Sequence, residues 1–97
     1  MEHMTYVTVE KEQIPALKFR NTDVLTNLHE RKQRMHHVSR ATVLGNGYHG
    51  KVEIFFETAD GEPKRVVTTI WDCDQEHLIL KSGACIPLRA VTGIEFY

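Results

Sequence analysis

The chain has 97 residues, of which 41% are hydrophobic and 26% are charged, and its formal net charge is −1. This length fits one domain, and the hydrophobic content excludes an intrinsically disordered chain. No run of the sequence approaches the roughly 20 apolar residues of a membrane helix, and the near-neutral charge excludes a nucleic-acid binder that relies on overall basicity.

The first twenty residues predict an N-terminal strand and arm. Residues 5–9 are rich in β-branched and aromatic side chains, which favours a short strand. Pro15 lacks an amide donor, so residues 14–19 are expected to form an edge strand or an extended arm. We assign residues 1–20 to this strand and arm.

A helix is predicted over residues 21–37. Three candidate N-cap residues occupy positions 21–23, and the apolar residues at 24, 25 and 28 share one helical face. Glu30 and Arg34 stand one turn apart, where they can pair on the exposed side of the helix. With so few apolar anchors, this helix is expected to lie against a sheet.

Residues 38–97 predict a succession of short strands and tight turns. Strands are expected at 38–44, 51–58, 65–71, 78–80, 84–86 and 94–97, with a helical turn at 88–91. Turns are expected at Gly45-Asn46-Gly47, Asp60-Gly61 and Ser82-Gly83, because glycine, Asn and Asp suit turn conformations. Within 51–58, alternation places Val52, Ile54 and Phe56 on one face and Glu53, Phe55 and Glu57 on the other.

These elements predict a mainly β fold. We expect a small, strongly bent antiparallel β-barrel of about five strands in residues 38–97, preceded by the helix and arm, as one domain overall. Closure has a physical reason, because an open sheet of this size leaves its edges unpaired.

The arrangement of these strands and turns resembles a known group of folds. It is carried by residues 52–56, 60–61, 68–70, 78–80, 86–88 and 94–96. In this pattern the C-terminal half resembles the Sm-like small β-barrels, in which a helix precedes five bent strands and a short helical turn separates the fourth from the fifth. It is also similar to the YolD-like family of small bacterial proteins. RNA-binding members of the Sm-like group use aromatic and Asn or Lys/Arg residues near strand ends, whereas the acidic loop 72–76 would repel phosphate here.

A basic segment around the end of the predicted helix is a candidate nucleic-acid site. The cations that could contact phosphate are Arg31, Lys32, Arg34, His37 and Arg40. The alternative is a solvated helix surface whose cations lie near the C-terminus, where the helix dipole favours them.

A second candidate site is a protein interface formed by Tyr6, Val7, Val9 and Phe55. If Phe55 faces outward it can anchor a partner, and otherwise it packs under the arm or helix. The arm over residues 5–19 is suited to add a strand to a neighbouring chain.

We expect neither a catalytic site nor a bound metal or cofactor. Adjacent histidines such as His36 and His37 diverge, and the two cysteines, Cys73 and Cys85, lie twelve positions apart without a CxxC pair; structural zinc prefers compact ligand pairs. Whether these two cysteines form a disulfide stays open. Ser39 and Ser82 lack a glycine elbow, and the glycines of 45–50 precede a strand where a phosphate loop would precede a helix.

The sequence therefore predicts a non-enzymatic binding module. It is expected to bind another protein or its own copies through sheet edges; the alternative is RNA binding through residues 31–40. The first residues show no basic stretch followed by an apolar one, and two cysteines are few for a small secreted scaffold. We therefore expect a cytoplasmic protein that does not bind membranes.

Overall fold

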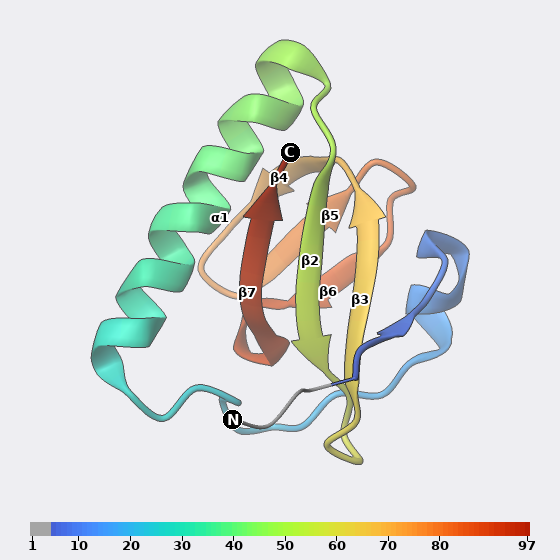
Figure 1. Cartoon of the computed structure of the whole chain (residues 1–97), viewed down its shortest axis with the longest axis vertical. Coiled ribbons are helices and arrows are strands. Elements are labelled where there is room, and N and C mark those ends of the chain that lie inside the picture. Colours follow the sequence, from blue (N-terminus) through green and yellow to red (C-terminus); the bar gives the residue numbers. More distant parts are fainter. Residues whose placement is uncertain (1–4) are drawn as a thin grey trace.

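The computed structural model describes residues 5–97, which form two small sheets and one long helix (Figure 1). The helices are the 3-10 helix η1 (Lys11–Ala16), α1 (Leu28–Tyr48) and the 3-10 turn η2 (Leu88–Ala90). The strands are β1 (Val7–Thr8), β2 (Val52–Glu57), β3 (Pro63–Thr68), β4 (Ile70–Cys73), β5 (His77–Leu80), β6 (Cys85–Pro87) and β7 (Val91–Phe96).

The strands pair into a four-stranded sheet of order β1-β3-β2-β7 and a three-stranded sheet of order β4-β5-β6. The pairs are antiparallel except β1 with β3, which is parallel. Only Thr69 separates β3 from β4, so one bent ribbon passes from the first sheet into the second. The prediction of a mainly β fold is confirmed, while the described strands form two sheets and show no closed barrel.

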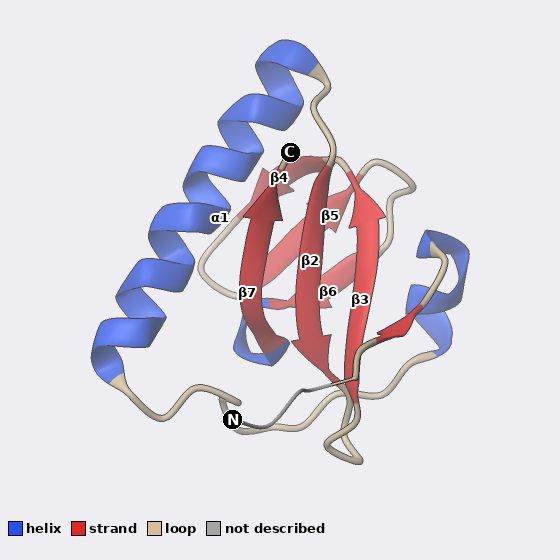
Figure 2. Cartoon of the chain, viewed as in Figure 1, coloured by secondary structure: helices blue, strands red, loops and turns tan. Residues whose placement is uncertain are grey.

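The core lies between the two sheets and under α1 (Figure 2). The predicted alternation along β2 is confirmed, since Val52, Ile54 and Phe56 are fully buried while the residues between them are half-buried. The largest fully buried side chains are Ile14, Val38, Val52, Ile54, Phe56, Val66, Ile70, Leu78, Leu80, Ile86 and Val91. Burial of such side chains is the main stabilising contribution to a fold of this kind.

The helix begins and ends later than the sequence predicts. Its N-cap is Asn27, whose side-chain oxygen accepts hydrogen bonds from the amides of His29 and Glu30, and residues 21–23 precede it. The expected strand at 38–44 and the turn at 45–47 are wrong, because α1 continues to Tyr48. The proposed boundary between residues 37 and 38 therefore falls inside this helix.

Tertiary packing explains the longer helix. Val38, Ala41 and Gly45 form a buried stripe at helical spacing that faces β4. At Gly45 the helix comes so close to the sheet that a Cβ atom would lie 2.0 Å from the carbonyl oxygen of Ile70. The helix ends at His49, which adopts a left-handed conformation with φ of 54° and donates its amide to the Gly45 carbonyl.

The arm is also more structured than expected. Residues 5–9 contain a strand, as predicted, but β1 is two residues long and pairs with β3 of its own chain. The expected edge strand or extended arm at 14–19 is wrong in its first part, because η1 occupies Lys11–Ala16. The Glu10 amide donates to the Gln13 side chain at the start of η1, and Ile14 is only 1% exposed.

The C-terminal half contains the predicted elements, although β7 begins at Val91, three residues before the expected strand. The strands expected at 51–58, 78–80, 84–86 and 94–97 and the helical turn at 88–91 correspond to β2, β5, β6, β7 and η2. The strand expected at 65–71 is divided at Thr69 into β3 and β4. Within residues 5–97, no helix combines the length and the apolar character that a membrane crossing requires.

Candidate functional site

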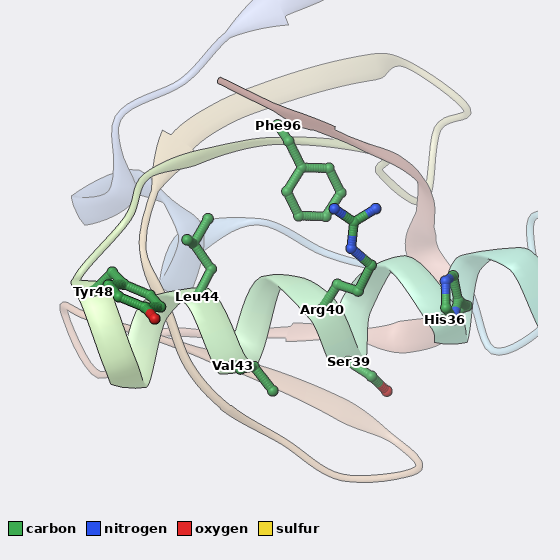
Figure 3. Close-up of a pocket in the computed structure, with 7 residues that line it drawn as sticks. All are labelled: His36, Ser39, Arg40, Val43, Leu44, Tyr48 and Phe96. Atoms are coloured by element: carbon green, nitrogen blue, oxygen red, sulfur yellow. The ribbon is translucent and has the colours of Figure 1, made fainter.

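The outer side of α1 and the end of β7 enclose a hollow of about 430 Å³. Its lining residues are His36, Ser39, Arg40, Val43, Leu44, Tyr48 and Phe96, and we call this set the α1–β7 surface (Figure 3). Six of these seven residues come from α1, and Phe96 projects from β7 toward Arg40. The hollow is open to solvent and lies outside the core.

Apolar side chains of this surface are strongly exposed. Val43 is 68% exposed and Tyr48 is 79% exposed. Seven large hydrophobic side chains are exposed among residues 5–97, and three of them, Leu28, Val43 and Tyr48, lie on α1. Trp71 and Tyr97 belong to or follow strands that contact this helix. Single exposed apolar residues are ordinary, but Val43 and Tyr48 both line one hollow, which is typical of an interaction surface.

A cation is fixed at the rim of the hollow. The guanidinium carbon of Arg40 lies 4.7 Å from the centre of the Phe96 ring, which is a cation–π contact. The ring of His37 meets the same aromatic ring edge-on, with centroids 6.2 Å apart. Stacking holds the Arg40 side chain in place, so less conformational entropy is lost when a carboxylate binds it.

The five candidate nucleic-acid residues do not form one exposed basic face. Arg34 is 6% exposed and its guanidinium binds both carboxylate oxygens of Asp23, so it is a structural residue. Arg31 donates to the Leu25 carbonyl and lies 3.5 Å from Asp23. His37 is half-buried against Phe96, while Lys32 and Arg40 are exposed, with the Arg40 guanidinium over the Phe96 ring.

The Arg34–Asp23 pair shows why this cation is held inward. Burial raises the pKa of Asp23, but the hydrogen bonds from Arg34 and the Leu25 amide, with the charges of Arg34 and Arg31, lower it overall. Arg34 also donates to the Val91 carbonyl at 3.1 Å. The carboxylate therefore stays ionised and satisfies a cation that would be costly to bury alone.

Of the four candidate interface residues, Val9 is buried, whereas Tyr6 and Phe55 are in contact with each other. Val9 belongs to the core at 8% exposure, while Val7 is 43% exposed at the β1 edge. The rings of Tyr6 and Phe55 meet edge-on with centroids 4.7 Å apart. Phe55 stands opposite Gly93 of β7 in the sheet register, so these two aromatic rings cover part of the outer sheet face.

Possible metal ligands do not cluster in residues 5–97. In the described part of the chain, no three His, Cys, Asp or Glu side chains come together as a metal site would need. Cys73 is half-buried, Cys85 is exposed, and both are free thiols.

Of the seven residues of the α1–β7 surface, sequence reasoning placed only Arg40 in a candidate site, and Val43, Leu44 and Tyr48 are among the six that it left out. The reason is that residues 38–44 were expected to form a strand, which would have turned Val43 and Leu44 to opposite faces. The signal that could have identified them is the helical spacing of Val38, Ala41 and Gly45, which are buried. A helix through these positions turns Val43 toward solvent.

Comparisons of this chain with protein-family models, with curated proteins and with solved structures found no match. The geometry of the described residues is thus the basis for the function proposed below.

Proposed function

We propose that the chain is a non-enzymatic binding module that holds another protein chain on the α1–β7 surface. The observation that carries this proposal is the exposure of Val43 and Tyr48, at 68% and 79%, beside a hollow lined largely by apolar atoms. Burying these side chains against a partner removes apolar area from water, which is the main driving force of protein association.

The residues have distinct roles in this proposal. Tyr48 and Val43 supply apolar contact area, and the tyrosine hydroxyl can keep a hydrogen bond at the wet edge of an interface. Arg40, stacked on Phe96, offers fixed donors for a carboxylate of the partner. Such an arrangement of apolar centre and charged rim is typical of protein interfaces.

The N-terminal arm is a less suitable binding element than the α1–β7 surface. The arm that was expected to add a strand to a neighbour is occupied within its own chain, because β1 pairs with β3 and Val9 donates its amide to the Arg65 carbonyl. The exposed apolar group beside α1 therefore supports binding better than strand addition by the arm does.

A site-specific photo-cross-link tests the proposal. A benzophenone amino acid placed at Val43 is expected to give a covalent protein adduct in cells that make this protein naturally, and mass spectrometry identifies the adduct. The matched control carries the same amino acid at Lys18, an exposed residue beside the β2–β3 turn. The second variant, Tyr48→Ser, should remove the adduct at position 43. No adduct, or the same adduct from both positions, would end the proposal.

Nucleic-acid binding is the second candidate function. It is favoured by the exposure of Lys32 and Arg40 and by the sequence of α1, which contains no carboxylate after Glu30. Anisotropy of a labelled single-stranded RNA at low and moderate salt tests it. A linear salt dependence whose slope falls in the double variant Lys32→Ala, Arg40→Ala would support this function, and no binding at low salt would remove it.

The closed, Sm-like form of the barrel belongs to the same proposal. It is supported by the ribbon that joins β3 to β4 and by the Leu88 amide, which donates to the Glu76 carbonyl at 2.8 Å and ties η2 to the β4–β5 loop. Slow amide exchange at both edges of the gap between β6 and β7 would support closure, and fast exchange there would contradict it.

A further inference from the structure

We infer that the chain bound on the α1–β7 surface is a second copy of this protein, which inserts its Trp71 into the hollow. This inference rests on the proposed function and names its partner. Trp71 of β4 is 45% exposed. Tryptophan is among the side chains that contribute most to binding energy at protein interfaces. It is also the single tryptophan of the chain.

Trp71 and the hollow lie at the same level along α1. Gly45 of the helix meets the carbonyl of Ile70, the residue just before Trp71. The hollow is lined by helix residues on both sides of that level, namely Val43, Leu44 and Tyr48. The projecting ring and the cavity are therefore in register along the helix axis.

The two features lie on opposite flanks of α1. β7, which contributes Phe96 to the hollow, belongs to the nearer sheet in Figure 1, and β4 belongs to the more distant one. The helix contacts both strands. We place two copies with their α1 helices side by side and related by a two-fold axis parallel to α1. The side of α1 that carries Trp71 in one copy then faces the side that carries the hollow in the other copy, and the same contact forms a second time. Such a contact is self-complementary, as a symmetric dimer requires.

The charges beside these features are complementary as well. Asp72 follows Trp71 and is exposed, and the nearby loop adds the exposed acids Asp74 and Glu76. Arg40 and Lys32 are exposed cations on the helix, and Arg40 lines the hollow. In the symmetric dimer, Asp72 of each copy lies on the side of the interface where Arg40 of the other copy lies, so the pairing of opposite charges occurs twice. Opposite charges placed this way set the register of an interface and exclude other partners.

The helix offers a long line of contact to a second copy. The 21 residues of α1 extend over about 31 Å at 1.5 Å per residue, which is close to the longest dimension of the molecule, 34 Å. Both flanks of this length are buried when the helices of two copies lie side by side.

The test combines sedimentation equilibrium with Trp71 fluorescence on the full chain, kept reduced, up to about 1 mM, where even weak specific pairs are populated. We expect a dimer whose dissociation on dilution shifts the tryptophan emission to longer wavelength with the same midpoint. A monomer at all concentrations, or a dimer whose emission does not change with dissociation, overturns the inference.

Charge exchange tests the register. Arg40→Glu and Asp72→Arg are each expected to raise the dimer Kd about tenfold, and the double variant should recover most of this loss. Trp71→Ala should raise the Kd on the order of 30-fold. Lys18→Glu, which makes the same charge change at an exposed position beside the β2–β3 turn, should leave the Kd unchanged. Single variants without effect, or a double variant without recovery, would contradict the pairing.

The outcomes also separate this inference from the proposed function. A monomeric chain that is cross-linked through position 43 to a different protein rejects the second copy and keeps the binding function. A cross-linked homodimer supports both, and a monomer without any adduct rejects both.

Discussion

Arg34 and Asp23 form a bidentate ion pair that ties the segment before α1 to the N-terminal part of that helix. Nη1 and Nη2 of the arginine donate to Oδ1 and Oδ2 of the aspartate at 2.8 and 2.7 Å. The same guanidinium donates to the Val91 carbonyl at the start of β7. One side chain therefore joins three parts of the chain that are distant in sequence.

Removing the aspartate should destabilise the fold strongly. Asp23→Ala leaves Arg34 buried without its counter-ion, and the free energy of unfolding is expected to fall by about 3 kcal/mol. Urea denaturation followed by circular dichroism measures the change. Glu12→Ala, at an exposed position of η1, is the control and should stay within about 0.5 kcal/mol of the parent. Equal stabilities of the two variants would show that the pair contributes nothing.

The same pair makes stability depend on acidity. The pKa of Asp23 is raised by burial but lowered overall by Arg34, the Leu25 amide and Arg31, to below 3.8. A lowered pKa in the folded state means that this contribution is complete above 3.8 and is lost as the pH falls through the folded-state value. The stability difference between the parent and Asp23→Asn should therefore shrink from about pH 6 to about pH 3.

Two other acids titrate over the same range without affecting this comparison. The pKa of Asp60 is lowered by its hydrogen bond from Thr58, and that of Asp74 by the amides of Glu76 and His77. Both are present in the parent and in the Asp23→Asn variant, so their effects cancel in the difference. A difference that is constant with pH would contradict the role given to Asp23.

The glycines near the end of α1 should respond in opposite directions to alanine. Gly45→Ala places a Cβ atom against the Ile70 carbonyl and is expected to cost about 3 kcal/mol, because the helix must move off β4. Gly47→Ala meets no atom within 4 Å and should stabilise the helix by about 0.5–1 kcal/mol. Thermal unfolding of the two variants checks both signs; destabilisation of similar size at both positions would show that close packing at Gly45 is not the cause.

His49 should be improved by glycine. Its φ of 54° lies in the left-handed region, which costs a residue with a Cβ atom about 1 kcal/mol. His49→Gly is therefore expected to raise the free energy of unfolding by about that amount. His29→Gly, at an exposed position in the first turn of α1, should lower it by about 0.5–1 kcal/mol. A stabilising effect at both positions, measured by urea denaturation, would speak against the capping explanation.

The arm should prove to be part of the folded domain. Ile14 of η1 is 1% exposed within the core, so Ile14→Ala is expected to cost about 3 kcal/mol. The control is again Glu12→Ala in the same 3-10 helix. If both variants unfold at the same urea concentration as the parent, η1 does not contribute to the core.

The sequence alone determined most of the second half of the chain. Alternation in residues 52–57, the turn residues at 60–61 and 82–83, and the helical turn near Leu88 depend on neighbours in sequence, so local rules predict them. The surroundings of individual side chains on these strands were less predictable. Phe55 was a candidate anchor by its position, yet contact with Tyr6 covers part of it.

Only the tertiary structure decided the length of α1 and therefore the site. Residues 38–44 contain β-branched side chains that favour a strand locally, but packing of Val38, Ala41 and Gly45 against β4 outweighs that preference. Arg34 is a surface cation by local rules and becomes a buried one because Asp23, eleven residues earlier, folds back onto it. The α1–β7 surface exists only because the helix continues past residue 37 beside Phe96, and this contact joins residues that no local pattern connects.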